Sequence, residues 1–390
     1  MMNSDQMKDW LQEWLENKQE EMVLFLEKLV NIDSYSHDQE DIHLMVTTLY
    51  DFLFQAGIHV HVIEEFDSLA VKASVGHVAG SLVFLTGHLD TVFKKGTVKQ
   101  RPFCLEENKA YGPGVADMKS GIVMNAFILV AMSELDKELE SGLPFSVTLF
   151  ATTDEEIGSP KGRHLIEKYL PSAVAVFNAE PGRISGNLVA ARKGGASYQI
   201  DIKGKAAHAG VSHADGISAI EIMAHIITRI HQLTDYQQGI TTNIGVIDGG
   251  TTPNTVAELA TAKLDVRFMT LEQGVSTAQQ IEQIVAHHAV NGAQASLIQL
   301  ANFLPFEVNM SAQLLTIMQQ EAHQLGFSVD GEYTGGCSDA GWTASMGIPT
   351  ICGTGPVGAY MHTDREYCLV DTFVERATLV ARATIAVALN

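Results

Sequence analysis

The chain has 390 residues, of which 46% are hydrophobic and 18% are charged, and its formal net charge at pH 7 is −21. This length favours two domains, and the apolar fraction is typical of a globular protein and excludes a disordered one. The negative charge, in a sequence without a basic patch, argues against nucleic acid or an anionic membrane as a partner.

The N-terminal stretch and the cysteines predict a cytoplasmic protein. The stretch MMNSDQMKDWLQEWLENKQEE is acidic and amphipathic, whereas a signal peptide has a basic start and an apolar centre. We also find no run of about 18 apolar residues that could span a bilayer. The cysteines lack CxxC spacing, which fits a reducing compartment and argues against a cysteine-based zinc site. They are Cys104, Cys337, Cys352 and Cys368.

Helical and β-rich segments alternate along the first half of the chain. Apolar residues at helical spacing predict helices in 7–30 and 39–56. Strands are then expected at 59–63, 69–73, 82–86, 146–151 and 174–178, with a helix at 119–135. This alternation predicts an α/β domain with helices on both sides of a mixed sheet. In such sheets, ligands bind at the carboxyl ends of the strands.

The order of elements changes between residues 187 and 298. The expected elements are a strand, a helix, two strands, a helix and a strand, at 196–203, 217–232, 241–248, 256–269, 275–290 and 295–300. This β-α-β-β-α-β order is that of ferredoxin-like domains. The α/β pattern then resumes. We expect a helix at 311–325, a strand at 328–333, a helix that begins at 339, a strand at 350–352 and a helix at 371–388. We therefore predict a catalytic domain, 1–186 and 299–390, and an inserted ferredoxin-like lid and dimerisation domain, 187–298.

Polar clusters follow several of the predicted strands or precede a predicted helix. A lone histidine is more often structural, the Glu155–Glu156 pair could be a solvated turn, and Asp117 could cap the next helix. As a set, however, carboxylates at one edge of a sheet would repel one another, and a divalent cation removes that repulsion. A mixture of imidazole and carboxylate suits zinc. The clusters are GHLDT (87–91), YGPGVADMKSG (111–121), TTDEEIGS (152–159), NAEPG (178–182) and YMHTDRE (360–366).

These clusters resemble the motifs of a known enzyme family. GHLDTVF, AYGPGVADMKSG, TTDEEIGS, AEP, GKAAHAG and MHTDREY are similar, in order and spacing, to those of the di-zinc exopeptidases. That family includes glutamate carboxypeptidase, aminoacylase, acetylornithine deacetylase and succinyl-diaminopimelate desuccinylase. The resemblance covers nearly the whole chain, including the inserted domain. It is strongest with glutamate carboxypeptidase, through HLDTVFKKG, RPF, KAYGPGVADMK and TDEEIGS.

The resemblance implies two Zn²⁺ ions in each subunit, with Co²⁺ or Mn²⁺ as substitutes. It implies that His88 and Glu180 hold one ion and that Glu156 and His362 hold the other. Asp117 would bridge the two ions. A site of this kind is that of a two-metal hydrolase.

The resemblance also assigns residues to the reaction. Asp90 would accept the second ring N–H of His88 and fix its tautomer. Glu155 would be the general base for a metal-bridging water that attacks the amide carbonyl, and it would return the proton to the leaving amine. His208, in GKAAHAG of the inserted domain, would stabilise the oxyanion in the active site of the partner subunit. A homodimer through the inserted domain is therefore implied.

Substrate recognition is expected in the inserted domain and in one turn. By resemblance, Asn254 and Arg267 engage the substrate. Arg267 lies in an otherwise apolar strand, LDVRF, where it needs a carboxylate partner or a binding role. A clamp on the free carboxylate of the substrate would satisfy it, and an internal salt bridge with Asp265 or Glu258 is the alternative.

Two positions depart from the pattern of the family. The turn GGCSDA (335–340) resembles a substrate-contacting turn whose glycine amides, such as that of Gly336, face the ligand, but Cys337 replaces a hydroxyl residue. Met118 replaces the acidic residue that many members carry after the bridging aspartate. The peptide bond at this place is often cis in the family, and we expect a cis Asp117–Met118 bond here.

The sequence therefore predicts a zinc-dependent hydrolase of amide or peptide bonds next to a free carboxylate. A glutamate carboxypeptidase that acts on a small peptide or an N-acyl amino acid fits best. An N-acyl amino acid deacylase or a dipeptidase is the alternative, because these enzymes cut the same kind of bond. A catalytically silent binding relative is the non-enzyme alternative, and the presence of every implied ligand and of Glu155 argues against it.

Overall fold

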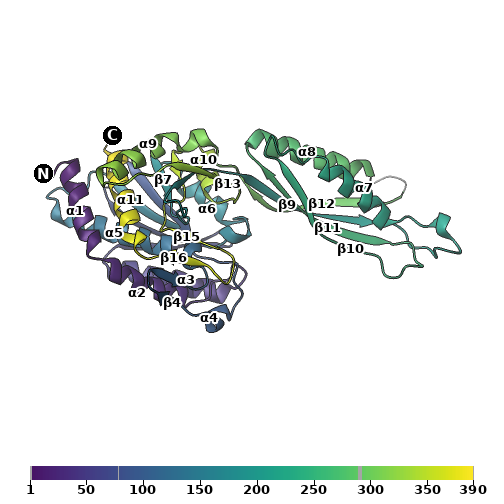
Figure 1. Cartoon of the computed structure of the whole chain (residues 1–390), viewed down its shortest axis with the longest axis horizontal. Coiled ribbons are helices and arrows are strands. Elements are labelled where there is room, and N and C mark those ends of the chain that lie inside the picture. The colour runs from purple at the N-terminus through teal and green to yellow at the C-terminus, as the bar shows by residue number, and fades with distance from the viewer. Residues whose placement is uncertain (1, 78, 289–291, 390) are drawn as a thin grey trace. The chain divides into compact units, whose positions relative to one another are not determined.

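The computed structural model describes residues 2–77, 79–288 and 292–389, and the chain divides into two compact units (Figure 1). The large unit comprises Met1–Ala191, Glu307–Thr334 and Ser338–Asn390, and the inserted unit comprises Arg192–Phe306 and Gly335–Cys337. We expected boundaries at 186/187 and 298/299. The observed division lies later because strand β8 (Leu188–Arg192) pairs with β13 (Gly331–Thr334), and β12 (Gln294–Phe303) continues past residue 298.

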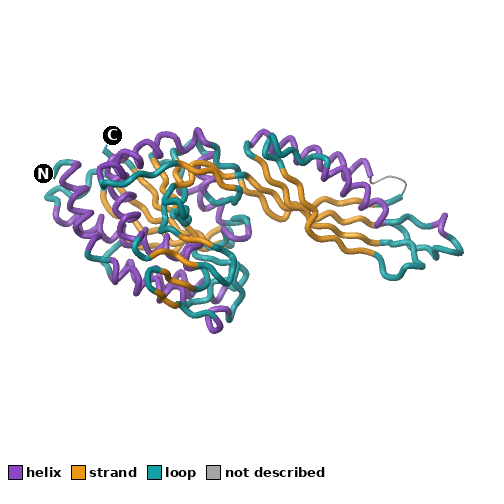
Figure 2. Tube along the Cα trace, viewed as in Figure 1, coloured by secondary structure: helices purple, strands orange, loops and turns teal. Residues whose placement is uncertain are grey.

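The large unit is built on one mixed sheet, which Figure 2 shows with its flanking helices. β3 runs parallel to β6 and to β7, and β7 runs parallel to β14, whereas β2 is antiparallel to both β1 and β6. The predicted mixed α/β architecture is confirmed. In sheet order, the strands are β1 (His59–Glu65), β2 (Ser68–Gly76), β6 (Ser146–Thr152), β3 (Leu82–His88), β7 (Ala175–Asn178) and β14 (Thr350–Ile351).

Helices cover both faces of this sheet. Side chains of residues directly opposite each other on neighbouring strands lie on the same face of the sheet, and successive side chains along one strand lie on alternate faces. Gly87 lies against Met118 and Ile122 at the start of α5 (Ser120–Glu138). The preceding residue, Thr86, pairs with Phe150, whose ring lies 6.0 Å from that of Tyr169 in α6 (Gly162–Tyr169). The helices α5 and α6 therefore lie on opposite faces.

One helical stretch of the large unit corrects an expectation from the sequence. The stretch Val115–Glu138 is long and apolar enough to cross a membrane by length and composition, although we expected no such run. However, 89% of its most apolar part is buried inside the protein. This part is apolar on nearly all sides, so α5 can pack against the sheet on one side and against α1 (Ser4–Glu16), α2 (Gln19–Val30) and α11 (Thr372–Ala388) on the other.

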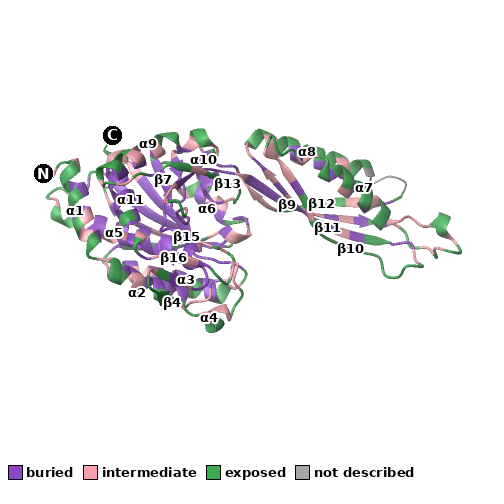
Figure 3. Cartoon of the chain, in the orientation of Figure 1, coloured by how far each residue is buried: buried purple, intermediate pink, exposed green. Residues whose placement is uncertain are grey.

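The remaining helices enclose the buried interior that Figure 3 shows in purple. The segment 7–30, predicted as helical, contains two helices, because α1 ends at Glu16 and the main-chain N–H of the next residue, Asn17, caps the helix end. The helices are α1 (Ser4–Glu16), α2 (Gln19–Val30), α3 (Gln39–Gln55), α4 (Thr97–Gln100), α9 (Val308–Gln324), α10 (Ala340–Ser345) and α11 (Thr372–Ala388).

A small sheet that the sequence did not predict lies in the same unit. Its strands occur in the order β15 (Gly358–Ala359), β16 (Tyr367–Leu369), β5 (Lys109–Tyr111) and β4 (Cys104–Glu106). Each strand is only two or three residues long, too short to show an alternating pattern. The pairing of β16 with β5 brings the segment after residue 357 beside the segment that leads into α5.

The inserted unit has the predicted ferredoxin-like arrangement. Its antiparallel sheet has the order β10-β11-β9-β12, and buried positions alternate along β11 where its inner face packs on the helices. β11 begins at Leu259 and not at 256, and residues 289 and 290 of the second predicted helix lie outside the described residues. The elements are β9 (Gly194–Lys203), α7 (Ala219–His231), β10 (Thr241–Gly249), β11 (Leu259–Phe268), α8 (Leu271–His288) and β12.

A buried ion-pair network joins three helices of the large unit. Nζ of Lys8 in α1 lies 2.6 Å from Oε1 of Glu321 in α9, and Nε of Arg382 in α11 donates to Oε2 of Glu321 at 3.1 Å. The residues are 6%, 3% and 6% exposed, respectively. Glu321 is therefore the shared counter-charge of two cations that water does not solvate.

We expect Glu321→Gln to lower the free energy of unfolding by about 3 kcal/mol, because the buried Lys8 loses its counter-charge and Arg382 keeps only the exposed Asp9 as an anionic partner. Urea unfolding followed by circular dichroism measures the loss. Glu134→Gln, which removes an exposed pair with Lys137, is the control and should cost less than about 1 kcal/mol. A Glu321→Gln protein as stable as the wild type would contradict the network's role.

Candidate metal centre and active site

Neighbouring parallel strands bring distant polar residues to one edge of the main sheet. His88 is the last residue of β3, and Glu180 lies two residues beyond the end of β7. Glu155 and Glu156 lie in a short 3₁₀ turn, Glu155–Ile157, that follows β6. Because β6, β3 and β7 are adjacent and parallel, their carboxyl ends meet at this edge.

Two further side chains come from loops. Asp117 lies in the tight turn Val115–Lys119, before α5, where its own φ of −113° and ψ of 94° leave the helical region. The Asp117–Met118 peptide bond is cis, so this prediction is confirmed. His362 lies in the loop between β15 and β16 and has a positive φ of 64°.

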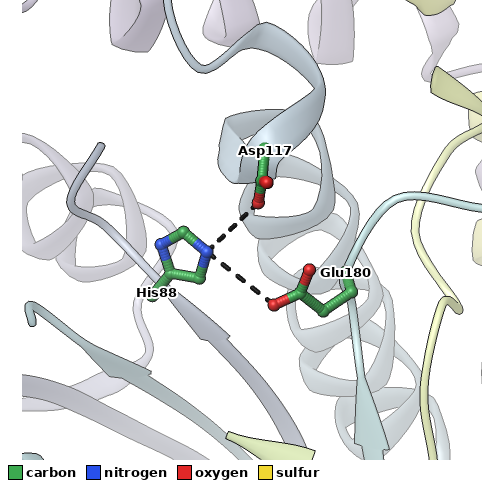
Figure 4. Close-up of side chains that lie close together, drawn as sticks. All are labelled: His88, Asp117 and Glu180. Atoms are coloured by element: carbon green, nitrogen blue, oxygen red, sulfur yellow. Dashed lines mark hydrogen bonds and ion pairs between the residues drawn. The ribbon is translucent and has the colours of Figure 1, made fainter. Parts of the chain in front are cut away.

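The first cluster consists of His88, Asp117 and Glu180, whose candidate ligand atoms all lie within 4.8 Å of one another (Figure 4). His88 Nε2 lies 3.3 Å from Asp117 Oδ1 and 3.8 Å from Glu180 Oε1. His88 Nδ1 lies 3.0 Å from the main-chain carbonyl of Asp90, which can only accept a hydrogen bond. In the neutral ring, Nδ1 therefore carries the proton and Nε2 presents a lone pair to the cluster.

The second cluster consists of Asp117, Glu156 and His362, again within 4.8 Å. His362 Nε2 lies 3.1 Å from Glu156 Oε2 and 3.3 Å from Asp117 Oδ2. Asp117 thus turns one oxygen to His88 and the other to His362. Asp117 is therefore shared by the two clusters, and the bridging role that the resemblance implies for it stays a prediction.

The electrostatics of the clusters reflect burial of like charges. Burial raises the pKa of Glu155 well above its usual value, and although His88 lowers it, neighbouring carboxylates add to the rise. Burial also raises the pKa of Glu156 to about 7. Hydrogen bonds to Asp117 and Glu156 raise the pKa of His362 to about 10. Burial would lower the pKa of His88, but Asp117 and Asp90 raise it well above its usual value. Burial thus disfavours the charged forms of the two glutamates, and a bound cation would favour them.

This donor set fits a pair of divalent cations. Oε1 of Glu156 is buried and has no hydrogen-bond partner among the described residues, so a carboxylate oxygen is left free for a ligand. Each cluster offers an imidazole nitrogen and carboxylate oxygens, and both share Asp117. Such mixed ligands suit zinc and related transition-metal ions.

Asp90 holds two parts of the site in place through hydrogen bonds. It is 0% exposed, and its carboxylate accepts the main-chain N–H of Glu155 at 3.2 Å and of Glu156 at 3.1 Å. Ser36 Oγ donates to Asp90 Oδ2 at 2.7 Å. The predicted contact between the Asp90 carboxylate and His88 Nδ1 measures 3.4 Å, so the main-chain carbonyl of Asp90 is the closer acceptor. Asp90 therefore orients both the imidazole and the turn that carries the two glutamates.

Two buried acids of this region, Asp339 and Glu366, were not predicted from the sequence as site residues. Asp339 accepts hydrogen bonds from Ser159 Oγ and, at 3.0 Å, from Thr152 Oγ1, and burial raises its pKa to about 7. These bonds link the start of α10 to the segment that carries Glu155. Glu366 binds the turn of Asp117 through main-chain N–H groups, and burial raises its pKa to about 7. Asp339 lies in the motif GGCSDA and Glu366 lies in MHTDREY, so these motifs were the sequence signals that could have identified the two residues.

His208 and Asn254 lie together in the inserted unit. Residues His208 and Thr255 form an antiparallel bridge, and Ala209 N–H donates to the Asn254 carbonyl at 2.9 Å. Gly210 N–H donates to His208 Nδ1 at 3.1 Å, so in the neutral ring Nε2 carries the proton. The exposed His208 side chain can therefore donate a hydrogen bond through Nε2.

Arg267, in the same unit, forms the internal salt bridge with Asp265 that the sequence offered as an alternative to a binding role. Its Nε and Nη2 donate to the two carboxylate oxygens of Asp265, both at 2.9 Å, and Nη1 lies 2.9 Å from Cys337 Sγ. Gly336 precedes this cysteine, and its carbonyl accepts from Arg192 Nη1 at 3.3 Å. Burial raises the pKa of the Cys337 thiol, which the adjacent guanidinium of Arg267 opposes.

The chain is similar in sequence to known proteins. The family model described as peptidase family M20/M25/M40 matches residues 84–386. Carboxypeptidase G2 from Pseudomonas sp. (strain RS-16) is 29% identical over 376 residues, which cover 94% of this chain and 89% of that protein. Acetylornithine deacetylase from Klebsiella pneumoniae (strain 342) is 35% identical over 209 residues, which cover 50% of this chain and 52% of that protein.

Solved structures share the fold. An M20 family metallo-carboxypeptidase from Sulfolobus solfataricus has a TM-score of 0.78 and 16% identity, with 95% of this chain and 100% of that chain covered. A Bacillus subtilis protein described as a dinuclear metal binding peptidase of the M20 family has a TM-score of 0.70 and 15% identity, with 96% and 99% covered. At these identities the likeness establishes the two-domain fold.

We expect Asp90→Asn to weaken the affinity for Zn²⁺ by about 10–100-fold, because the two glutamate N–H groups then face a side chain with one acceptor oxygen. Titration calorimetry of the metal-free protein with Zn²⁺ measures the change. Asp136→Asn is a matched control, since Asp136 also accepts a main-chain N–H, from Leu143, but at the far end of α5. Equal affinities in the Asp90→Asn protein and the wild type would refute the role of Asp90.

Proposed function

The chain belongs to peptidase family M20/M25/M40 and is therefore a metal-dependent hydrolase of peptide or amide bonds, and we propose that it is a carboxypeptidase of the glutamate carboxypeptidase type. The observation that carries this proposal is the convergence of two ligand clusters on one shared carboxylate, Asp117. The similarity to carboxypeptidase G2 supports the carboxypeptidase reaction, because it extends over 94% of the chain.

The residues of the site have separate tasks in this proposal. His88, Asp117 and Glu180 would hold one cation, and Asp117, Glu156 and His362 would hold the other. We propose Zn²⁺ as the native ion, with Co²⁺ or Mn²⁺ as substitutes, because each cluster mixes imidazole and carboxylate. When bound, such ions polarise a carbonyl group and acidify water at neutral pH.

Glu155 is the proposed general base. Its Oε2 lies 3.8 Å from His88 Nε2, so it stands beside the first cluster without being one of its members. Burial and the neighbouring carboxylates raise its pKa, which gives the carboxylate the basicity to take a proton from water. It would then transfer that proton to the departing amine nitrogen.

Recognition of the substrate would use the inserted unit. Arg267 has five N–H groups. One on Nε and one on Nη2 bind Asp265, and one on Nη1 binds Cys337. The remaining two can bind the free carboxylate of a small peptide or N-acyl amino acid. We propose that Asn254 and the Gly336 amide contact the same ligand and that His208 donates to the oxyanion through Nε2 in a homodimer. The free cysteines support a cytoplasmic location.

An N-acyl amino acid deacylase is the second candidate function. The observation that favours it is the 35% identity with acetylornithine deacetylase, which is higher than the identity with carboxypeptidase G2 but extends over only 50% of the chain. A dipeptidase would use the same ligands. The Zn²⁺-loaded protein should be assayed against folate-like acyl glutamates, N-acetyl amino acids and dipeptides. The proposal predicts the highest kcat/KM for the acyl glutamates, and a preference for N-acetylornithine would replace it with the deacylase.

We expect Glu155→Gln to lower kcat by about 10²–10⁴-fold, because the amide cannot take the proton of the attacking water. Metal content should stay at the wild-type value, which elemental analysis of the same sample checks. Glu140→Gln, at an exposed position, controls for the loss of a negative charge. Turnover of the Glu155→Gln protein at the wild-type rate would remove Glu155 from the mechanism.

We expect Arg267→Ala to raise KM by roughly 10–100-fold with a smaller effect on kcat, because a charged hydrogen bond to the substrate carboxylate is lost. The same substrate with its C-terminal carboxylate amidated should show little difference between the wild type and the variant. Arg229→Ala, which removes a guanidinium from α7 of the same unit, is the control. An unchanged KM for the free acid would assign Arg267 to its internal pair with Asp265 alone.

A further inference from the structure

We propose that Glu366 is a positioning residue of the metal centre, which fixes the turn of Asp117 and joins it to the loop of His362. The inference rests on the proposed metal-dependent function and adds a residue to it. Glu366 is outside both ligand clusters. It acts through main-chain atoms of a ligand and not on the cations themselves.

The carboxylate of Glu366 is buried and accepts hydrogen bonds from several main-chain N–H groups. The residue is 1% exposed. Its Oε1 accepts the N–H groups of Ala116 at 2.9 Å and of Asp117 at 3.0 Å, and its Oε2 accepts that of Gly114 at 3.2 Å. Three charge-assisted hydrogen bonds from consecutive parts of one turn hold that turn in a single conformation.

The turn needs such an acceptor because it is the irregular start of a helix. The first N–H groups of a helix have no partner within it, and the positive end of the helix favours a negative charge. Gly114 has a left-handed φ of 70°, and the non-helical Asp117 interrupts the helical path. Glu366 supplies this acceptor from a segment 249 residues away.

Glu366 also bonds to the loop that carries His362, the histidine of the second cluster. Its own N–H donates to the carbonyl of Thr363, the residue after His362, at 3.4 Å. That carbonyl also accepts from Arg101 Nη1 at 3.2 Å. On its other side, Glu366 leads directly into β16, where Tyr367 pairs with Tyr111 of β5. A single side chain thus connects the loop of His362 to the turn of Asp117.

The consequence for the site follows from the position of Asp117. Its two oxygens face different imidazoles, His88 at 3.3 Å and His362 at 3.3 Å. A rotation of the Asp117 backbone would move both oxygens together, so a loose turn would weaken both cation sites at once. Removal of Glu366 should therefore lower the affinity for cations more than it lowers the stability of the fold.

The test compares two buried carboxylates. Glu366→Gln and Glu321→Gln are titrated with Zn²⁺ after removal of metal, and their stabilities are measured in urea. We expect Glu366→Gln to bind Zn²⁺ about 10–100-fold more weakly than the wild type, as loss of a supporting hydrogen bond does in other metal sites. Its kcat at low Zn²⁺ should fall and recover in excess Zn²⁺. Glu321→Gln, 3% exposed and part of the Lys8–Arg382 network, should lose stability and keep its Zn²⁺ affinity.

The outcomes separate the inference from the function on which it rests. A Glu366→Gln protein with the wild-type Zn²⁺ affinity overturns the role of Glu366 alone. A wild-type protein that takes up no Zn²⁺, Co²⁺ or Mn²⁺ overturns the metal centre itself. Should Glu366→Gln not fold, Glu366→Asp keeps the charge but withdraws it from the turn. It is expected to show an intermediate loss of affinity, and an unchanged affinity contradicts the inference.

Discussion

Buried negative charge at the carboxyl ends of β6, β3 and β7 is the constraint on which the rest of the structure depends. The side chains of Glu155, Glu156 and Glu180 are 8%, 5% and 6% exposed, and that of Asp117 is 14% exposed, so water screens them poorly. Two imidazoles compensate only part of this charge, and burial, to which the charge of Asp117 adds, raises the pKa of Glu156 to about 7. Cations relieve the repulsion, and the fold must hold the carboxylates in place for them.

The fold meets this requirement with small residues and with acceptors of main-chain N–H groups. A side chain at Gly121, in the first turn of α5, would meet the carbonyl of Ala179 at 2.0 Å, so glycine lets this helix approach the end of β7, next to Glu180. Asp90 then fixes the turn of Glu155 and Glu156, and Asp339 bonds to Ser159 beyond it. The ligands are thus supported from the strands, from the helix and from the loops.

The sequence predicted the features that repeat or that sit directly after regular elements. Alternating strands and helices were sufficient for the mixed sheet and for the ferredoxin-like order of the inserted unit. The positions of His88, Glu156 and Glu180 follow from adjacent parallel strands. The place of Asp117 in both clusters and the cis peptide bond were accessible only through resemblance to a family, because no local pattern encodes them.

Other features depend on contacts between distant segments, which periodicity does not show. The strands β5 and β16 are three residues long each and pair across 256 positions, as Tyr111 with Tyr367. The acceptor role of Glu366 depends on this pairing, and that of Asp339 depends on bonds to Thr152 and Ser159, 187 and 180 positions away. The pair of Arg267 with Asp265 was one of two alternatives, since composition alone does not decide between a partner two residues away and a bound carboxylate.

Anomalous diffraction at the zinc absorption edge, from crystals of the Zn²⁺-loaded protein, tests the central claim most directly. The account predicts two peaks in each subunit. One should lie among His88, Asp117 and Glu180, and the other among Asp117, Glu156 and His362. No peak in this region, or a peak bound by other side chains while these five stand apart, would contradict it.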